Sequence, residues 1–180
     1  MGGTVRREDQ AARADNRCMT SLLTETATTV PATLDTGLLP GPTELHARLT
    51  ARLLEAGTRP GALVVVGLLR RDTGWPLAGS AITTVTALLA GALRGDDWLA
   101  REDHTEFAVL ADGAPADADV LAARLAGVVT GAVTGIHACA GVVTLETGMT
   151  AHEAERRAVL CLDAARHRGP NTVVHYRGTR

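Results

Sequence analysis

Aromatic residues are nearly absent from this chain of 180 residues, which has one Phe, one Tyr and two Trp. Proteins that bind single-stranded nucleic acid stack bases on aromatic side chains, so this scarcity argues against that class of function. The formal net charge is only −2 at pH 7, so the chain as a whole does not attract polyanions. We therefore expect no nucleic-acid partner, and any phosphate binding has to come from a local cluster of arginines.

Long apolar runs are missing as well. No segment approaches the roughly 18 apolar residues that a membrane span needs, and residues 1–17 lack the apolar stretch of a signal peptide. Cys18, Cys139 and Cys161 are odd in number and far apart, without the spacing of zinc ligands. These absences predict a cytoplasmic protein with no membrane partner and no metal site, whose thiols are reduced and mostly buried.

The apolar share is nevertheless 46%, supplied mainly by Ala, Leu and Val, which suits helices packed on a sheet. Residues 1–32 are rich in Arg, Asp and Thr and lack strong periodicity. We interpret them as a flexible N-terminal arm with a short helix around residues 19–25. Prolines and glycines then lead into one domain over residues 33–180.

Hydrophobic periodicity predicts alternating helices and strands within this domain. Helical spacing begins at Thr43 and at Gly79 or Ser80. Residues 112–119 are a loop and the start of a third helix, whose apolar face is formed by Val120, Leu121, Leu125 and Val128, and a last helix covers 151–167. The order α β α β β α β α β predicts an α/β domain of the α+β, palm-like type, a mixed central sheet of about five strands with helices packed against it. The predicted strands are 62–69, 98–101, 106–111, 136–143 and 171–176.

The most informative stretch is RGDDWLAREDHTEF, residues 94–107. Its polar tip, DHTEF at 103–107, resembles the Gly-Gly-Asp/Glu-Glu-Phe turn that names the GGDEF family of diguanylate cyclases. In that family the turn begins two residues after an arginine, as this tip does after Arg101. Glu106 and Phe107 match the family turn, whereas both glycines and its first carboxylate are replaced.

Other landmarks follow the same order as in the family. Arg94-Gly95-Asp96-Asp97 resembles the RxxD of its product-binding inhibitory site and ends six residues before the tip. Thr36-Gly37-Leu38-Leu39 resembles the TGL entry motif, and ACAGVV at 138–143 resembles the SIGVA strand. Ala165-Arg166 followed by Gly169-Pro170-Asn171 resembles the AK…GRN ending. The resemblance therefore covers about residues 34–176.

The family joins two GTP molecules into cyclic di-GMP with the help of two metal ions, which require clustered carboxylates. By resemblance, Gly67 at the end of the first central strand and Thr105 in the tip stand where those carboxylates belong. Asp103 and His104 replace the glycines, and one carboxylate, Glu106, does not make a two-metal site. We expect these positions to be degenerate, with no catalytic residue and no cofactor, and Mg²⁺ only if cyclase activity persists.

The inhibitory site of the family binds cyclic di-GMP, and the resemblance assigns this role to Arg94 and Asp97. Arg124, on the helix after the hairpin, is the third candidate. Guanidinium groups bind phosphate bidentately and stack on purines. The structural alternative is that Arg94 only ends a helix, where the dipole favours a cation, and that Arg124 is only a solvated surface residue.

The sequence thus predicts a catalytically inactive, bacterial GGDEF-like signalling domain that is a cyclic di-GMP receptor, with a protein partner expected and a homodimer left open. A first alternative is a ligand-free protein-interaction scaffold, which an exposed apolar patch would favour. A second is a residual diguanylate cyclase or nucleotide hydrolase, which an unexpected carboxylate near Glu106 would favour.

Overall fold

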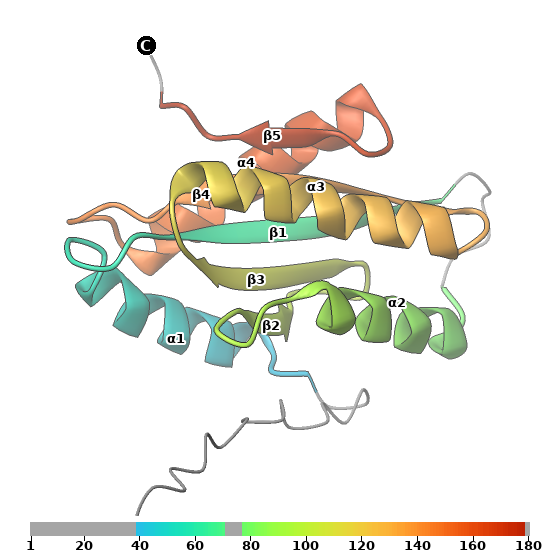
Figure 1. The fold of residues 1–180 in the computed structure, drawn as a ribbon, viewed down its shortest axis with the longest axis horizontal. Helices are drawn as coiled ribbons and strands as arrows, with labels where there is room; N and C mark the ends of the chain where they lie inside the picture. The colour runs from blue at the N-terminus through green and yellow to red at the C-terminus, as the bar shows by residue number, and fades with distance from the viewer. Residues whose placement is uncertain (1–38, 71–76, 179–180) are drawn as a thin grey trace, which may run out of the picture. The chain divides into compact units, whose positions relative to one another are not determined.

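The computed structural model describes residues 39–70 and 77–178. The predicted arm, its short helix, the domain boundary at residue 32, Thr36 to Leu38 and Cys18 all lie outside these residues. The predicted order of helices and strands is confirmed within them (Figure 1). The elements are α1 Pro42–Leu54, β1 Gly61–Arg70, α2 Gly79–Ala92, β2 Trp98–Arg101, β3 Glu106–Asp112, α3 Pro115–Ala132, β4 Ile136–Thr144, α4 Ala151–Arg168 and β5 Val173–His175.

The five strands form one mixed sheet in the order β2-β3-β1-β4-β5, as the fold-class prediction required. Central β1 pairs antiparallel with β3 and with β4, and only β5 pairs in parallel, with β4. Helices α2 and α3 cover one face of the sheet, and α1 and α4 cover the other (Figure 1). The continuous apolar run of β1 is explained by this arrangement, because a strand covered on both faces needs apolar residues at every position.

Side chains of β1 alternate between two cores, since successive residues of a strand point to opposite faces. Val64 and Val66 pack with α2 and α3, where Phe107, the single Phe of the chain, is fully buried. Leu63 and Val65 pack with α1 and α4. Cys139 and Cys161 are buried free thiols, which confirms the prediction for these two.

Two local predictions are wrong. Val120 is 65% exposed and does not belong to the apolar face of α3, because the buried positions of that helix are those in register with Leu121, Leu125 and Val129. The last strand is shorter than 171–176, because Asn171, with φ of 58°, still belongs to the turn that leaves α4.

Polar contacts fasten the short edge strand β5. The hydroxyl of Thr144 lies 3.0 Å from Nε2 of His175, and Nδ1 of His175 lies 2.8 Å from Oδ1 of Asp119. These contacts join β5 to β4 and to α3, so three residues suffice to complete the sheet. No helix among the described residues is long and apolar enough to cross a membrane.

His137 in β4 is the least satisfied side chain of the sheet, because both of its ring nitrogens are buried without a hydrogen-bond partner. An unsatisfied buried polar group costs about 1–3 kcal/mol. We predict that His137→Leu raises the free energy of unfolding by about that amount and the melting temperature by several degrees. Thermal and urea unfolding measure this, with His152→Leu at an exposed position of α4 as the control. A lower melting temperature for His137→Leu than for the control would contradict the assignment.

Candidate functional site

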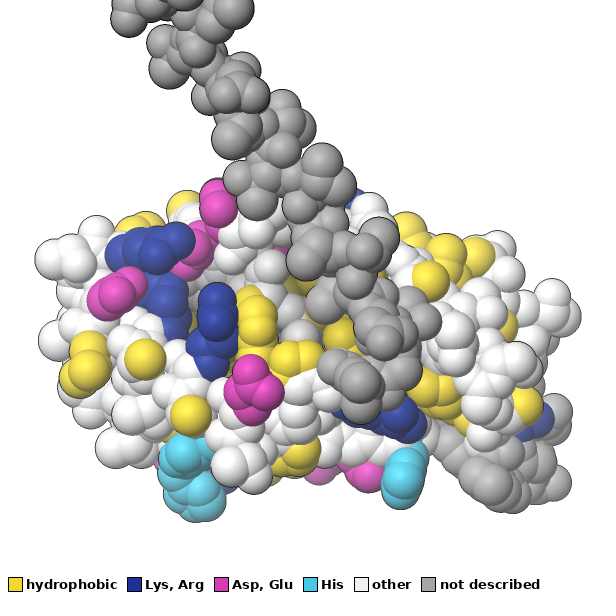
Figure 2. Space-filling view, turned by 90° about the horizontal axis from the view of Figure 1, so that it is seen from below, with side chains coloured by type: hydrophobic (Ala, Val, Ile, Leu, Met, Phe, Trp, Pro, Cys, Tyr) yellow, Lys and Arg dark blue, Asp and Glu magenta, His cyan; other side chains and the backbone are white. Residues whose placement is uncertain are grey.

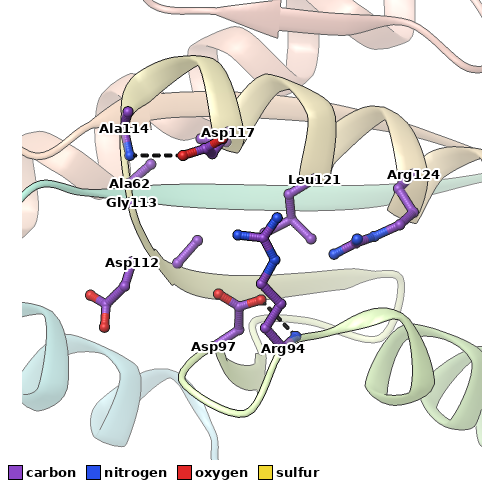
Figure 3. Close-up of a pocket in the computed structure, with 11 residues that line it drawn as sticks. Ala62, Arg94, Asp97, Asp112, Gly113, Ala114, Asp117, Leu121 and Arg124 are labelled. Atoms are coloured by element: carbon purple, nitrogen blue, oxygen red, sulfur yellow. Dashed lines mark hydrogen bonds between the residues drawn. The ribbon is translucent and has the colours of Figure 1, made fainter.

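A surface pocket lies where the end of β3 and the start of β1 meet α3 and the turn after α2 (Figure 3). Arg94, Asp97 and Arg124, the three residues selected from the sequence as ligand contacts, all line this pocket. They come from two segments about 30 residues apart, so the fold brings them together. The remaining lining residues are Ala62, Ala111, Asp112, Gly113, Ala114, Asp117, Ala118 and Leu121.

Two hydrogen bonds between Arg94 and Asp97 stabilise the turn that carries them. The backbone amide of Arg94 donates to Oδ2 of Asp97 over 2.9 Å, and the amide of Asp97 donates to the carbonyl of Arg94 over 3.1 Å. The RxxD spacing therefore has a local structural use, because the aspartate fixes the turn at the end of α2. The same contacts leave the guanidinium of Arg94 and the second carboxylate oxygen of Asp97 available to a ligand.

The carboxylates of the pocket all have protein partners. Besides Asp97, Asp117 accepts a hydrogen bond of 3.2 Å from the amide of Ala114 at the start of α3. Asp112 forms ion pairs with Arg52 and Arg59.

The guanidinium groups of the two pocket arginines, unlike the carboxylates, have no protein partners among the described residues. Within the described part of the chain, neither the guanidinium of Arg94 nor that of Arg124 has a hydrogen bond or an ion pair. Arg124 extends from α3 toward the side of Arg94 (Figure 3). Two unpaired cations beside satisfied carboxylates make this pocket suited to an anionic ligand.

The hairpin tip lies against β1. Gly67 is paired with Glu106 across the two strands, and the amide of Leu68 donates to the carbonyl of Thr105 over 2.8 Å. The expectation that Gly67 ends its strand is wrong by three residues, because pairing with β4 continues to Arg70. Asp103 and His104 are exposed at the tip.

An ion pair from α4 fills the space beside Gly67. Nη2 of Arg166 lies 2.6 Å from Oε1 of Glu106. A Cβ atom at Gly67 would lie 2.9 Å from Leu162 and 3.0 Å from Nη2 of Arg166. The carboxylate of Glu106 at the hairpin tip is thus paired with an arginine. Among the described residues, no group of three or more His, Cys, Asp or Glu side chains is arranged to hold a metal ion.

The pocket and the hairpin tip are on opposite faces of the sheet. Ala62 and Ala111 of the pocket pack with α2 and α3, whereas Gly67 faces Leu162 and Arg166 of α4. A change of side chains at the tip therefore does not alter the lining of the pocket directly.

The sequence analysis did not predict the arginines that pair with the carboxylates of the pocket and of the hairpin tip. Arg52 and Arg59 at the pocket, and Arg166 at the tip, contact carboxylates 53 to 60 residues away in the chain. No local spacing signals such contacts. The motif at Arg166 was noticed, but its pairing with Glu106 depends on the packing of α4 against β1.

Charged groups are interspersed on the surface. Figure 2 shows one face on which basic and acidic side chains lie close to one another, with apolar side chains between them. The largest exposed apolar side chains of the described residues come from three different helices, α1, α3 and α4. They are Leu54, Val120, Val159 and Leu160.

Glu102, next to the hairpin tip, is half-buried, and its Oε2 is enclosed without a hydrogen-bond partner. Burial raises the pKa of its carboxyl above the ordinary value of 4.5, and the nearby Glu155, Glu106 and Asp103 raise it further. Because the pKa of this carboxyl is higher in the folded state, the folded protein favours the protonated form. The free energy of unfolding therefore falls as the pH rises from the unfolded-state pKa through the folded-state pKa.

We therefore predict that Glu102→Gln stabilises the protein at pH 7 and that the gain disappears near pH 3.5, where the carboxyl is protonated in both folded and unfolded states. Melting temperatures measured between about pH 3.5 and pH 8 test this. Glu146→Gln, at an exposed position, is the control and is expected to show no such gain. A gain for Glu102→Gln that is independent of pH would argue against charge as its cause.

Comparison with known proteins supports the fold. No protein-family model matches the sequence, and no curated protein is similar to it in sequence. Among solved structures, the diguanylate cyclase SiaD from Pseudomonas aeruginosa, in complex with its activator SiaC, is 20% identical with a TM-score of 0.69. The match covers 77% of this chain and 59% of SiaD, so this chain spans less than two thirds of that protein.

Two isolated domains match over nearly their whole length. The GGDEF domain of DgcB from Caulobacter crescentus, in complex with c-di-GMP, is 19% identical with a TM-score of 0.67, over 76% of this chain and 91% of that domain. The active GGEEF domain of a diguanylate cyclase from Vibrio cholerae is 18% identical with a TM-score of 0.68, over 79% of this chain and all of that domain. The described chain therefore has the fold of GGDEF domains, as the sequence predicted.

Proposed function

We propose that this chain is a receptor domain for cyclic di-GMP that does not synthesise it. The observation that carries the proposal is the pair of unpaired guanidinium groups, Arg94 and Arg124, that line one pocket together with Asp97. Two arginines can each bind a phosphodiester bidentately. The free oxygen of Asp97 can accept hydrogen bonds from the Watson–Crick edge of guanine, which carries adjacent N–H donors.

Two further observations support the choice of ligand. The pocket lining includes small residues, among them Ala62, Ala111 and Ala118, which obstruct a planar base less than large side chains would. The same fold is found in complex with c-di-GMP in the DgcB domain. The ligand class is thus proposed from the charges of the pocket and from the chemistry that this fold accommodates elsewhere.

The absence of synthesis is proposed on separate grounds. Gly67 and Thr105 cannot ligate a hard divalent cation through a carboxylate, and Glu106 is already paired with Arg166. The exposed Asp103 and His104 add bulk and negative charge where the family resemblance places the glycines next to a triphosphate. A receptor of this kind acts through unequal affinity of cyclic di-GMP for two states or two assemblies of the protein.

The first test is enzymatic. We predict that the purified protein, incubated with GTP and Mg²⁺ or Mn²⁺, forms no cyclic di-GMP, because a two-metal reaction needs clustered carboxylates. Chromatography of the nucleotides measures this. Formation of product at turnover rates, abolished by Glu106→Ala, would establish the residual cyclase instead.

The second test is binding. Calorimetric titration is expected to show binding of cyclic di-GMP to the unmodified protein. Loss of a charged hydrogen-bonding group costs about 1.5–3 kcal/mol, so Arg94→Ala is expected to weaken binding by about 10- to 150-fold. Asp97→Ala is expected to have a similar effect on affinity, and Arg124→Ala a smaller one.

Arg168→Ala is the matched control, since it removes the same charge from an exposed position at the end of α4. Its affinity is expected to equal that of the unmodified protein, and Arg94→Ala is expected to leave the melting temperature nearly unchanged. If 100 μM cyclic di-GMP produces neither heat nor a thermal shift with the unmodified protein, the receptor proposal is wrong and the interaction scaffold replaces it.

A further inference from the structure

Asp112 is the pocket residue whose charge opposes the proposed ligand. It ends β3 and lines the pocket. Its Oδ1 accepts a hydrogen bond of 3.0 Å from Nε of Arg52 and lies 2.9 Å from Nη2 of the same side chain. Its Oδ2 is paired with Arg59. The carboxylate points toward the α1 side and away from Arg94 (Figure 3).

Arg52 is held firmly in this position. Its side chain is only 11% exposed, and its Nη2 also donates to the carbonyl oxygens of Arg59 and Pro60, each over 2.9 Å. The guanidinium therefore joins α1, the segment before β1 and the end of β3. Arg59 is more accessible, with 54% of its side chain exposed, and it acts on Asp112 from the solvent side.

The net charge around the pocket depends on these two residues. The lining contains Arg94 and Arg124 against three aspartates, Asp97, Asp112 and Asp117, a formal charge of −1. With Arg52, Arg59 and Glu55, whose carboxylate lies 3.7 Å from Nη1 of Arg59, included, the formal charge becomes 0. An anion would be repelled by the lining alone, and the complete cluster removes this repulsion.

We propose that Arg52 and Arg59 are positioning residues that let this pocket accept an anion, by fixing and neutralising the carboxylate of Asp112. The inference rests on the proposed receptor function and adds how its pocket accepts an anion. Without the two arginines, the carboxylate of Asp112 is an unpaired negative charge at the edge of the pocket, and it repels the phosphates of a ligand.

The experiment compares Arg59→Ala with the double variant Arg59→Ala/Asp112→Asn. Arg59→Ala is expected to weaken binding of cyclic di-GMP by about 3- to 10-fold, the size of one partly exposed charge interaction, and more strongly at low salt than at high salt. The double variant is expected to return to within about twofold of the unmodified affinity, because asparagine keeps the acceptor for Arg52 and removes the charge. Asp112→Asn alone is expected to bind at least as well as the unmodified protein.

A purely structural role of the ion pairs gives a different result. Asp112→Asn would then weaken binding by itself and would not rescue Arg59→Ala, and either outcome overturns the inference while leaving the receptor function intact. Arg52→Ala and Arg52→Ala/Asp112→Asn repeat the comparison, with circular dichroism to exclude unfolded variants. Arg168→Ala controls for the loss of one positive charge.

Failure of the receptor proposal is separable from failure of this inference. If the unmodified protein does not bind cyclic di-GMP, the same variants are titrated with inorganic pyrophosphate. Rescue of pyrophosphate binding by Asp112→Asn would support the neutralisation of Asp112 without the receptor function. Absence of binding to both probes, or binding that ignores Arg59 and Asp112, would overturn the inference.

Discussion

The burial of β1 between two helix layers is the constraint on which the rest of the structure depends. Residues 61–68 of this strand are buried, and the strand pairs with β3 on one side and β4 on the other. Because side chains alternate along it, Ala62 contributes to the pocket beneath α3 while Gly67 faces α4. Two candidate functional regions are thus positioned by one strand, at different points along it and on opposite faces.

Charge pairing determines what each region can do. At the pocket, aspartates are satisfied by backbone amides and by arginines from outside, and two arginines remain unpaired within the described chain. At the hairpin tip the arginine is not free, since Arg166 forms an ion pair with the carboxylate of Glu106. The first arrangement favours an anionic ligand. In the second, the carboxylate that could ligate a metal ion is already paired with an arginine. This contrast is the physical basis for proposing binding without synthesis.

Much of the architecture could be predicted from local sequence. The continuous run of residues 62–69 required a strand covered on both faces, and the alternation of helical and strand patterns gave the element order that the structure confirms. The predictions were wrong where burial or strand length depends on packing against neighbouring helices and strands. Val120 has the character of a core residue, yet only the packing of α3 against β4 and α2 determines which side of that helix is buried. The end of β1 likewise depends on how far β4 extends beside it.

The sequence by itself determined the fold class, the location of the hairpin in the chain and the choice of Arg94, Asp97 and Arg124 as candidate ligand contacts. Those features depend on periodicity and on motifs within short segments. Only the tertiary structure decided that these three residues share a pocket, that Arg52 and Arg59 neutralise Asp112, and that Arg166 pairs with Glu106. Ion pairs between residues more than 50 positions apart leave no spacing in the sequence, because they form only when the helices have packed on the sheet.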